Sequence, residues 1–260
     1  MVFSHRRRCR AFPACLAALG AVAVLVPGAA SAAPCPTALV PSYISPADTL
    51  AWNRLVTSTQ PGGMVTINPA SGPGTASDPA YAAAVARARA AGLTVIGYAH
   101  TSYGTRPASD VKAEIGRYRK WYGVTSIFFD EAATSRDALS YYQTLARQVH
   151  ANGGLVVLNP GVTPDQGYAD LADVVVTFEG DSAAYAAAPA PPAWTASYPA
   201  SRFGQLVYAS AAADLNGVLS RAAARHASRL YVTDDVLDNP WDTLASYYEQ
   251  EAAATSGCAV

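Results

Sequence analysis

The chain has 260 residues, of which 51% are hydrophobic and 14% charged, and it carries 18 basic against 19 acidic residues. This composition is typical of a folded globular protein, and a mild charge without a basic stripe argues against a nucleic-acid partner. Four of the basic residues lie within the first 33, which leaves 14 basic and 19 acidic residues after them and a net charge near −5.

The first 33 residues have the three parts of a secretory signal peptide. Arg6-Arg7-Arg8 and Arg10 form a basic start, Ala11–Val26 is apolar, and Ala30-Ser31-Ala32 is a small-residue cleavage site. The apolar stretch is short for a membrane span, and no second one follows. We therefore expect a secreted, extracellular protein with no membrane attachment after cleavage, and a single mature domain over residues 34–260.

Two cysteines, Cys35 and Cys258, stand at the two ends of the predicted mature chain. A single pair of cysteines in an exported protein is typical of a disulfide. The sequence therefore predicts a bridge that joins the termini.

Eight short runs rich in β-branched and aromatic residues alternate with helical stretches along the mature chain. Several of them, such as Leu155-Val156-Val157-Leu158, are almost continuously apolar, as strands are in a sheet covered on both faces. Eight units of roughly 25 residues, each a strand and then a helix, predict an α/β fold with a single (β/α)8 TIM barrel. An open doubly wound sheet is the competing architecture, but no glycine-rich phosphate turn follows the first strand. The predicted strands are Leu39–Ile44, Met64–Asn68, Thr94–Ala99, Ser126–Asp130, Leu155–Asn159, Val174–Glu179, Gln205–Tyr208 and Leu230–Asp234.

Polar residues that favour helix starts, and glycines that favour helix ends, delimit the segments between the strands. We expect Asp48 to cap the first helix and Asp242 the last, and we interpret Ser71-Gly72-Pro73-Gly74 and Ala183–Pro192 as loops. The clearest predicted helices are 79–91, 110–122 and 136–151, which glycine follows at positions 92, 123 and 153.

Two acids stand where predicted strands end, which is the working face of a TIM barrel. Asp130 closes the run Ser126-Ile127-Phe128-Phe129, and Glu179 closes Val174–Phe178. Cleavage of a glycosidic bond requires such a pair, one acid to protonate the leaving oxygen and one to face the developing cation. The competing interpretation is that both acids only close loops.

The other strand-end residues suit a sugar better than a phosphate or a metal. Aromatic rings stack on the apolar faces of sugars, and amides and carboxylates bond ring hydroxyls. The two lysines of the mature chain lie on one predicted helix, and His150 and His226 fall away from the strand ends. We expect no metal and no cofactor, and we expect His100 to be a turn residue rather than a base. The predicted substrate-binding residues are Tyr43, Asn68, Tyr98, Tyr103, Asn159, Trp194 and Asp234.

Some of these residues also have a purely structural interpretation. Asn68 and Asn159 precede prolines, where an asparagine often only begins a turn. Trp194 follows an Ala/Pro-rich run and is predicted to be a mobile sugar platform beside the site, but it could equally anchor a helix against the barrel. The tyrosines could equally be barrel packing with a hydroxyl that reaches water.

The strand ends also resemble those of a known family, the spherulation-specific family 4 proteins, which are also classed as glycoside hydrolase family 135. The resemblance covers nearly the whole mature chain. It implies a (β/α)8 barrel that hydrolyses α-1,4 linkages in galactosamine-containing exopolysaccharide, as an α-N-acetylgalactosaminidase-like enzyme, with catalytic roles on Asp130, Glu131 and Glu179. The segments that carry it are Tyr43, Ile67-Asn68-Pro69 with Ser71-Gly72-Pro73-Gly74, Gly97-Tyr98 with Thr101 and Tyr103-Gly104, Phe128-Phe129-Asp130-Glu131, Asn159-Pro160-Gly161, Phe178-Glu179 and Thr233-Asp234.

The predicted function is that of a secreted, monomeric, endo-acting glycosidase with a polysaccharide substrate. Asp130 is the expected nucleophile, and Glu179 is the expected general acid/base, with a pKa raised by apolar neighbours such as Phe178. Glu131 shares the site only if the chain bends after Asp130, because neighbouring residues of a strand point to opposite faces. The reverse assignment of Asp130 and Glu131 stays open.

Two rival functions use the same barrel. One is a carbohydrate-binding or cell-envelope protein without turnover, since binding and hydrolysis would use the same aromatic rim. The other is an enzyme that acts on sugar acyl groups, for which the sequence offers no visible nucleophile or metal set.

Overall fold

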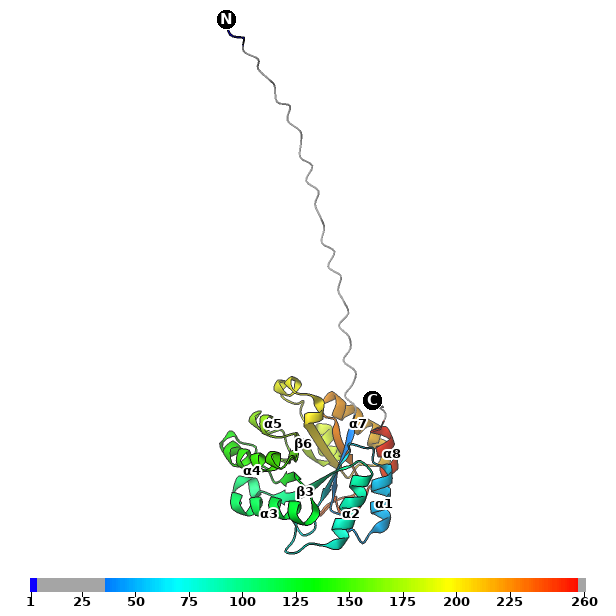
Figure 1. Ribbon diagram of the computed structural model, residues 1–260. Helices are drawn as coiled ribbons and strands as arrows, with labels where there is room; N and C mark the ends of the chain where they lie inside the picture. The colour runs from blue at the N-terminus through cyan, green and yellow to red at the C-terminus, as the bar shows by residue number, and fades with distance from the viewer. Residues whose placement is uncertain (4–35, 257–260) are drawn as a thin grey trace. The chain divides into compact units, whose positions relative to one another are not determined.

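The computed structural model describes residues 1–3 and 36–256, and the barrel lies within the second of the two parts into which the chain divides, Ala33–Val260. The predicted signal peptide and the predicted Cys35–Cys258 bridge fall outside the described residues. Eight parallel strands close into a barrel in chain order, and β1 pairs with β8. Figure 1 shows the helices arranged around the strands. The predicted TIM barrel is therefore confirmed, and the open doubly wound sheet is excluded.

The strands lie close to their predicted positions, and only their ends differ. Ser126–Asp130 is the same in sequence and structure, whereas the seventh strand begins at Phe203, before its predicted start at Gln205. The strands are β1 Thr37–Ser42, β2 Met64–Ile67, β3 Thr94–His100, β4 Ser126–Asp130, β5 Val156–Leu158, β6 Val174–Asp181, β7 Phe203–Tyr208 and β8 Arg229–Val232.

Eight α-helices and five short 3-10 helices follow the strands in the described part of the chain. The α-helices are α1 Thr49–Ser58, α2 Pro79–Ala90, α3 Ala108–Tyr122, α4 Leu139–Ala151, α5 Gly167–Leu171, α6 Ser182–Ala187, α7 Leu215–Ala224 and α8 Tyr248–Ala254. The 3-10 helices are η1 Ser102–Gly104, η2 Arg136–Ala138, η3 Ala193–Ser197, η4 Ala200–Arg202 and η5 Ala212–Asp214.

Helix caps explain several of these bounds. The Asp48 carboxylate accepts a hydrogen bond from Ala51 N at 2.9 Å and so caps α1, as the sequence predicts. Gly123 ends α3 in the left-handed region, at φ 63°. The prediction for Asp242 is wrong, because α8 begins only at Tyr248 and the chain between them is loop.

The segment Ala183–Pro192 is not a simple loop, which corrects the sequence-based interpretation. Its first half belongs to α6, which Asp181 caps by accepting a hydrogen bond from Ala184 N at 2.7 Å. Alanine has the highest helix propensity, so an alanine-rich run needs only this cap to begin a helical turn. The result is a short helix directly above the end of β6.

The core is built from almost continuously apolar strands. All four residues of β2 and all three of β5 are buried, as expected for a sheet covered on both faces. Large aromatic side chains such as Trp52, Tyr118 and Tyr142 are fully buried, and burial of a large side chain contributes roughly 1.5–3 kcal/mol.

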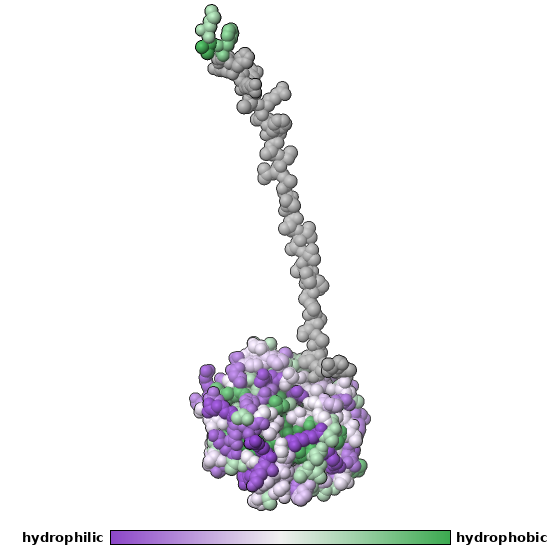
Figure 2. Space-filling model, viewed as in Figure 1, coloured by the Kyte–Doolittle hydropathy of each residue, from purple (hydrophilic) through white to green (hydrophobic). Residues whose placement is uncertain are grey.

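The face of the molecule that Figure 2 shows mixes hydrophilic and hydrophobic residues. None of the helices in the described residues has the length and apolar content that a membrane span needs.

Candidate active site

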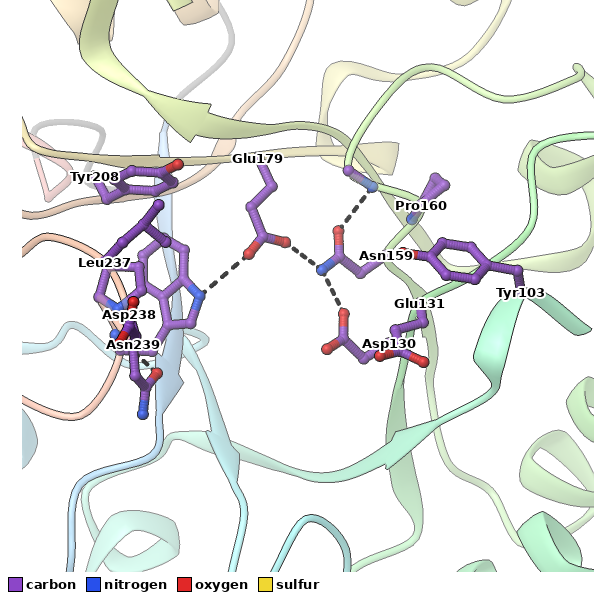
Figure 3. A pocket seen from close by; sticks show the side chains of 13 residues that line it. Tyr103, Asp130, Glu131, Asn159, Pro160, Glu179, Tyr208, Leu237, Asp238 and Asn239 are labelled. Carbon is purple, nitrogen blue, oxygen red and sulfur yellow. Dashed lines mark hydrogen bonds between the residues drawn. The ribbon is translucent and has the colours of Figure 1, made fainter. Parts of the chain in front are cut away.

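A cleft of about 370 Å³ opens where the barrel strands end, and acids and aromatics line it (Figure 3). A TIM barrel carries its active site on this face, since the βα loops converge there. The lining residues are Tyr103, Asp130, Glu131, Asn159, Pro160, Gly161, Glu179, Tyr208, Leu237, Asp238, Asn239, Pro240 and Trp241.

Asp130, the last residue of β4, points into this cleft and is held by two side chains. The Tyr98 hydroxyl donates to its Oδ2 at 3.0 Å, and Asn159 Nδ2 donates to its Oδ1 at 2.7 Å. Burial raises the pKa of Asp130, and the hydrogen bonds from Glu131 N, Tyr98 and Asn159 act against that rise. The carboxylate is therefore fixed in orientation at both of its oxygens.

Glu179 faces Asp130 from β6. Trp241 Nε1 donates to its Oε1 at 3.1 Å, and Asn159 Nδ2 donates to its Oε2. Burial, and then the charge of Asp130, raise the pKa of Glu179 to about 7, against the lowering effect of the two donors. The raised pKa agrees in direction with the sequence-based expectation, and the neighbouring charge is a cause that the sequence analysis did not name.

A register shift in β6 aims Glu179 at the cleft. Val176 pairs with Gly204 and Glu179 pairs with Leu206, so three residues of β6 span the same distance as two of β7. Side chains alternate with a period of two, and a regular strand would place Val176 and Glu179 on opposite faces. The extra residue puts them on the same face, as β-bulges near active sites do.

Asn159 joins the two acids. Its side chain is buried, and its Oδ1 accepts a hydrogen bond from Gly161 N at 3.1 Å, so the amide nitrogen faces the carboxylates. That nitrogen donates to both Asp130 and Glu179, as Figure 3 shows. Two N–H bonds of one amide diverge by about 120°, which puts the two accepting oxygens roughly 4–5 Å apart. Asn159 therefore both begins a turn and sets the spacing of the acids.

Glu131 also lines the cleft, because the chain bends directly after Asp130. Its φ is 49°, in the left-handed region, so it leaves the alternation of β4. The Thr101 hydroxyl donates to the carbonyl oxygens of Asp130 and Glu131, at 3.0 and 2.8 Å, and holds the bend. The Glu131 carboxylate lies 3.7 Å from His100 Nδ1.

The three predicted tyrosines are placed in different ways. Tyr103 is 66% exposed and lines the cleft opposite Tyr208 (Figure 3). Tyr43 is not a lining residue and instead packs edge-to-face on Tyr98, with ring centroids 5.3 Å apart. Tyr98 and Tyr43 therefore support Asp130 from behind rather than offering a sugar platform.

Three predicted substrate-binding residues are not brought to the acids. The Asn68 side chain closes its own turn by accepting from Gly72 N at 2.9 Å, and Asp234 accepts from Ser246 N at 2.9 Å. The prediction that Trp194 flanks the site is wrong. Its ring packs 5.9 Å from that of Phe203, the first residue of β7 and thus at the other end of the strand from the cleft.

The loop after β8 supplies residues that the sequence analysis missed. Leu237 to Trp241 form one wall of the cleft, and Tyr208 packs edge-to-face on Trp241 at 6.1 Å. Trp241 is a buried aromatic that directly follows Asn239-Pro240. That Asn-Pro-aromatic cluster downstream of the last strand was the only signal in the sequence.

The charges in the cleft are acidic. Within the described residues its lining contains Asp130, Glu131, Glu179 and Asp238 but no lysine or arginine. In the same part of the chain, no three His, Cys, Asp or Glu side chains gather as metal ligands do.

Two partly buried carboxylates that share one amide donor at the strand ends of a barrel are an arrangement typical of carbohydrate-active proteins. The model of the spherulation-specific family 4 matches residues 37–255, and the chain belongs to this family, which confirms the resemblance noted above.

Spherulin-4 of Physarum polycephalum is 34% identical over 230 residues, which cover 83% of this chain and 69% of that protein. Among solved structures, Aspergillus clavatus Sph3 in complex with GalNAc is similar, with a TM-score of 0.73 and 24% identity over 86% of this chain and 98% of that one. This likeness independently supports the fold.

Proposed function

We propose that this protein is a retaining glycoside hydrolase, in which Asp130 is the nucleophile and Glu179 the general acid/base. The observation that carries the proposal is the single amide of Asn159, which bonds both carboxylates. Retaining glycosidases hold their two carboxyl groups roughly 5–5.5 Å apart, whereas inverting ones leave roughly 6.5–9.5 Å for a water. One shared nitrogen fits the shorter spacing.

The protonation of the pair supports these roles. A pKa of about 7 leaves Glu179 largely protonated at mildly acidic pH. Asp130 carries the negative charge that contributes to this rise, and it accepts hydrogen bonds that favour its ionised form. The two acids titrate as a coupled pair, and we assign the proton that they hold near neutrality to Glu179.

The reaction would proceed in two steps. Glu179 donates its proton to the glycosidic oxygen while an Asp130 oxygen bonds the anomeric carbon, and the leaving sugar departs with that proton. Glu179, now ionised, takes a proton from water, the water oxygen bonds the anomeric carbon, and Asp130 is released. Tyr98 and Asn159 would hold Asp130 in line, and Trp241 would hold Glu179.

For the substrate we propose a galactosamine-containing polysaccharide, cleaved internally at α-1,4 linkages. Membership of the family supports this class, and the related Aspergillus clavatus Sph3 is described in complex with GalNAc. An acidic lining also suits a polymer that carries free amino groups better than an anionic one. We further propose that the protein is secreted through its first 33 residues, acts as a monomer, and carries the Cys35–Cys258 bridge.

The test is the release of reducing ends from an α-1,4-linked polymer of galactosamine and N-acetylgalactosamine, with chitosan and a neutral α-glucan as comparison substrates. Asp130→Asn and Glu179→Gln keep the shape of each side chain, and each is expected to lower the rate by roughly 10²–10⁴-fold, while the protein still binds the polymer. A substrate with a good leaving group should partly rescue Glu179→Gln but not Asp130→Asn.

Asp234→Asn is the matched control, since Asp234 is an acid near the end of β8 that the cleft does not include. It should behave as the wild type. Binding of the polymer without release of reducing ends by the wild type would instead favour a carbohydrate-binding protein on the same barrel.

A further inference from the structure

A second hollow, of about 450 Å³, adjoins the cleft on the side of β6, β7 and the loop after β8. Tyr208 and Leu237 belong to the lining of both hollows, so they form the wall between them. A chain-like ligand that leaves the cleft across this wall enters the second hollow. The residues that line the second hollow are Asp181, Ser182, Ala183, Tyr208, Ala209, Val236 and Leu237.

The part of the second hollow that the loop after β8 forms is apolar although it is exposed. Val236 and Leu237 are neighbours in the chain, and both are exposed, at 56% and 64%. In the described chain after residue 3, the large apolar side chains that are this exposed are Leu50, Tyr103, Val162, Val236 and Leu237. Tyr103, Val236 and Leu237 line one of the two hollows, and Val162 directly follows the lining residue Gly161. Exposed apolar side chains that gather beside a cleft are consistent with a surface that contacts a ligand.

The positions of the two acids give the second hollow a direction. Figure 3 shows Glu179 on the side of Tyr208 and Leu237, whereas Asp130 and Glu131 lie toward Tyr103. The general acid protonates the oxygen of the leaving group. The sugars that depart first therefore lie on the Tyr208 side, next to the second hollow.

We propose that the second hollow is a leaving-group subsite that binds the next sugar of a polysaccharide. The inference rests on the proposed glycosidase function and extends it. The apolar C–H face of the sugar would pack on Val236 and Leu237, and its polar groups would face Asp181 and Ser182 on the opposite rim. The subsite gives the enzyme a preference for a continuing chain over a single sugar with a small leaving group.

The test uses two neighbouring alanines of α6 that are both exposed. Ala183 lines the second hollow and Ala184 does not, so Ala183→Trp fills the hollow and Ala184→Trp is its matched control. Rates are measured on two substrates, the α-1,4 galactosamine polymer and a nitrophenyl glycoside of an N-acetylgalactosamine trisaccharide. The nitrophenyl group is too short to extend far beyond the wall.

Ala183→Trp is expected to lower kcat/KM for the polymer roughly 10-fold relative to the nitrophenyl glycoside, the factor that about 1.4 kcal/mol of lost binding gives. Val236→Asn, which replaces the apolar rim with a neutral polar side chain, should shift the same ratio in the same direction. Ala184→Trp should leave the ratio unchanged. An unchanged ratio in both Ala183→Trp and Val236→Asn overturns the subsite.

A binding measurement separates the subsite from the proposed chemistry. In the Asp130→Asn background, the affinity for a hexamer of the same sugars is measured by titration calorimetry with and without Ala183→Trp. Hexamer binding that is roughly 10-fold weaker with Ala183→Trp supports the subsite. If the wild type hydrolyses neither substrate, that result counts against the glycosidase function and not against the subsite. Equal hexamer affinity counts against the subsite alone.

Discussion

The two sides of the cleft are built differently. On the side of β4, β5 and β6, Asp130 and Glu179 stand on strands, are partly buried, and are held at both oxygens by hydrogen bonds. On the side of the loop after β8, Val236 and Leu237 are exposed and apolar. Reacting groups must be held within a fraction of an ångström, which strands and buried bonds provide, whereas sugar recognition tolerates a loop. Trp241 connects the two sides, because it is a loop residue that bonds Glu179.

Apart from replacement of the acids themselves, the largest effect should come from replacement of the Asn159 amide on the strand side. Asn159→Ala removes the donor to both acids, and we expect kcat/KM for the polymer to fall by roughly 10²–10³-fold, as for other preorganised donors. The pKa of Glu179 should also rise, since a hydrogen bond to the ionised form is lost. The alkaline limb of the pH–rate profile should therefore move to higher pH.

Asn68→Ala is the matched control for this variant. Asn68 also precedes a proline and also accepts from a glycine N–H, but it lies outside the cleft. It should cost about 1 kcal/mol of stability and leave the rate within twofold of the wild type. Equal loss of activity in both variants would mean that the Asn-Pro turns act only through the fold.

The second prediction concerns stability on the strand side. The folded protein holds Glu179 at a pKa of about 7, above its unfolded value near 4.5, so it binds more protons than the unfolded chain between those pH values. Stability from this group is full below about pH 4.5 and is lost as pH rises through 7. This group should lower the free energy of unfolding of the wild type by roughly 2–3 kcal/mol between pH 5 and pH 8. Glu179→Gln has no titrating group at this position, so its free energy of unfolding should not show this loss.

Urea unfolding at the two pH values measures this difference. Glu249→Gln is a suitable comparison, because the Arg54 hydrogen bond lowers the pKa of Glu249 to about 2 and its titration lies below both pH values. If the free energy of unfolding falls by the same amount between pH 5 and pH 8 in the wild type and in Glu179→Gln, the pKa of Glu179 is not raised.

The smallest effect tests the connection between the two sides. Trp241→Phe keeps a ring against Tyr208 and Tyr231 but removes the indole N–H that Glu179 accepts. We expect kcat/KM to fall about 10-fold, the equivalent of about 1.4 kcal/mol, and the alkaline limb to shift slightly upward in pH. The pH–rate profile is the measurement. If the rate falls with no shift of that limb, Trp241 acts by packing alone.

The position of a residue could be predicted from the sequence where that residue belongs to a regular strand or to its end. The eight strands and the strand-end positions of Asp130 and Glu179 could be predicted because apolar runs and their ends are local patterns. Asn159 was predicted as a sugar contact, and the structure brings it into the cleft but bonds it to the acids, a relation that depends on two other strands.

The loop residues could not be placed in the same way. An aromatic beside prolines looks the same in sequence whether it packs at the amino end of the barrel, as Trp194 does, or lines the cleft, as Trp241 does. Which end it reaches depends on the path of the whole loop, and short-range patterns carry no record of that path.

The surplus residue in β6 has a consequence for how such a barrel evolves. The barrel accommodates one residue more between Val176 and Glu179 of β6 than between Gly204 and Leu206 of β7, and the bulge keeps Val176 and Glu179 on the same face. Deletion of one of the two residues between Val176 and Glu179 would remove the bulge and restore regular alternation, and Glu179 would still face Asp130 because it would then stand two residues after Val176. One further deletion or insertion that no bulge absorbs would turn the carboxylate to the opposite face. The direction of this acid therefore depends on the number of residues in β6 and on the bulge together.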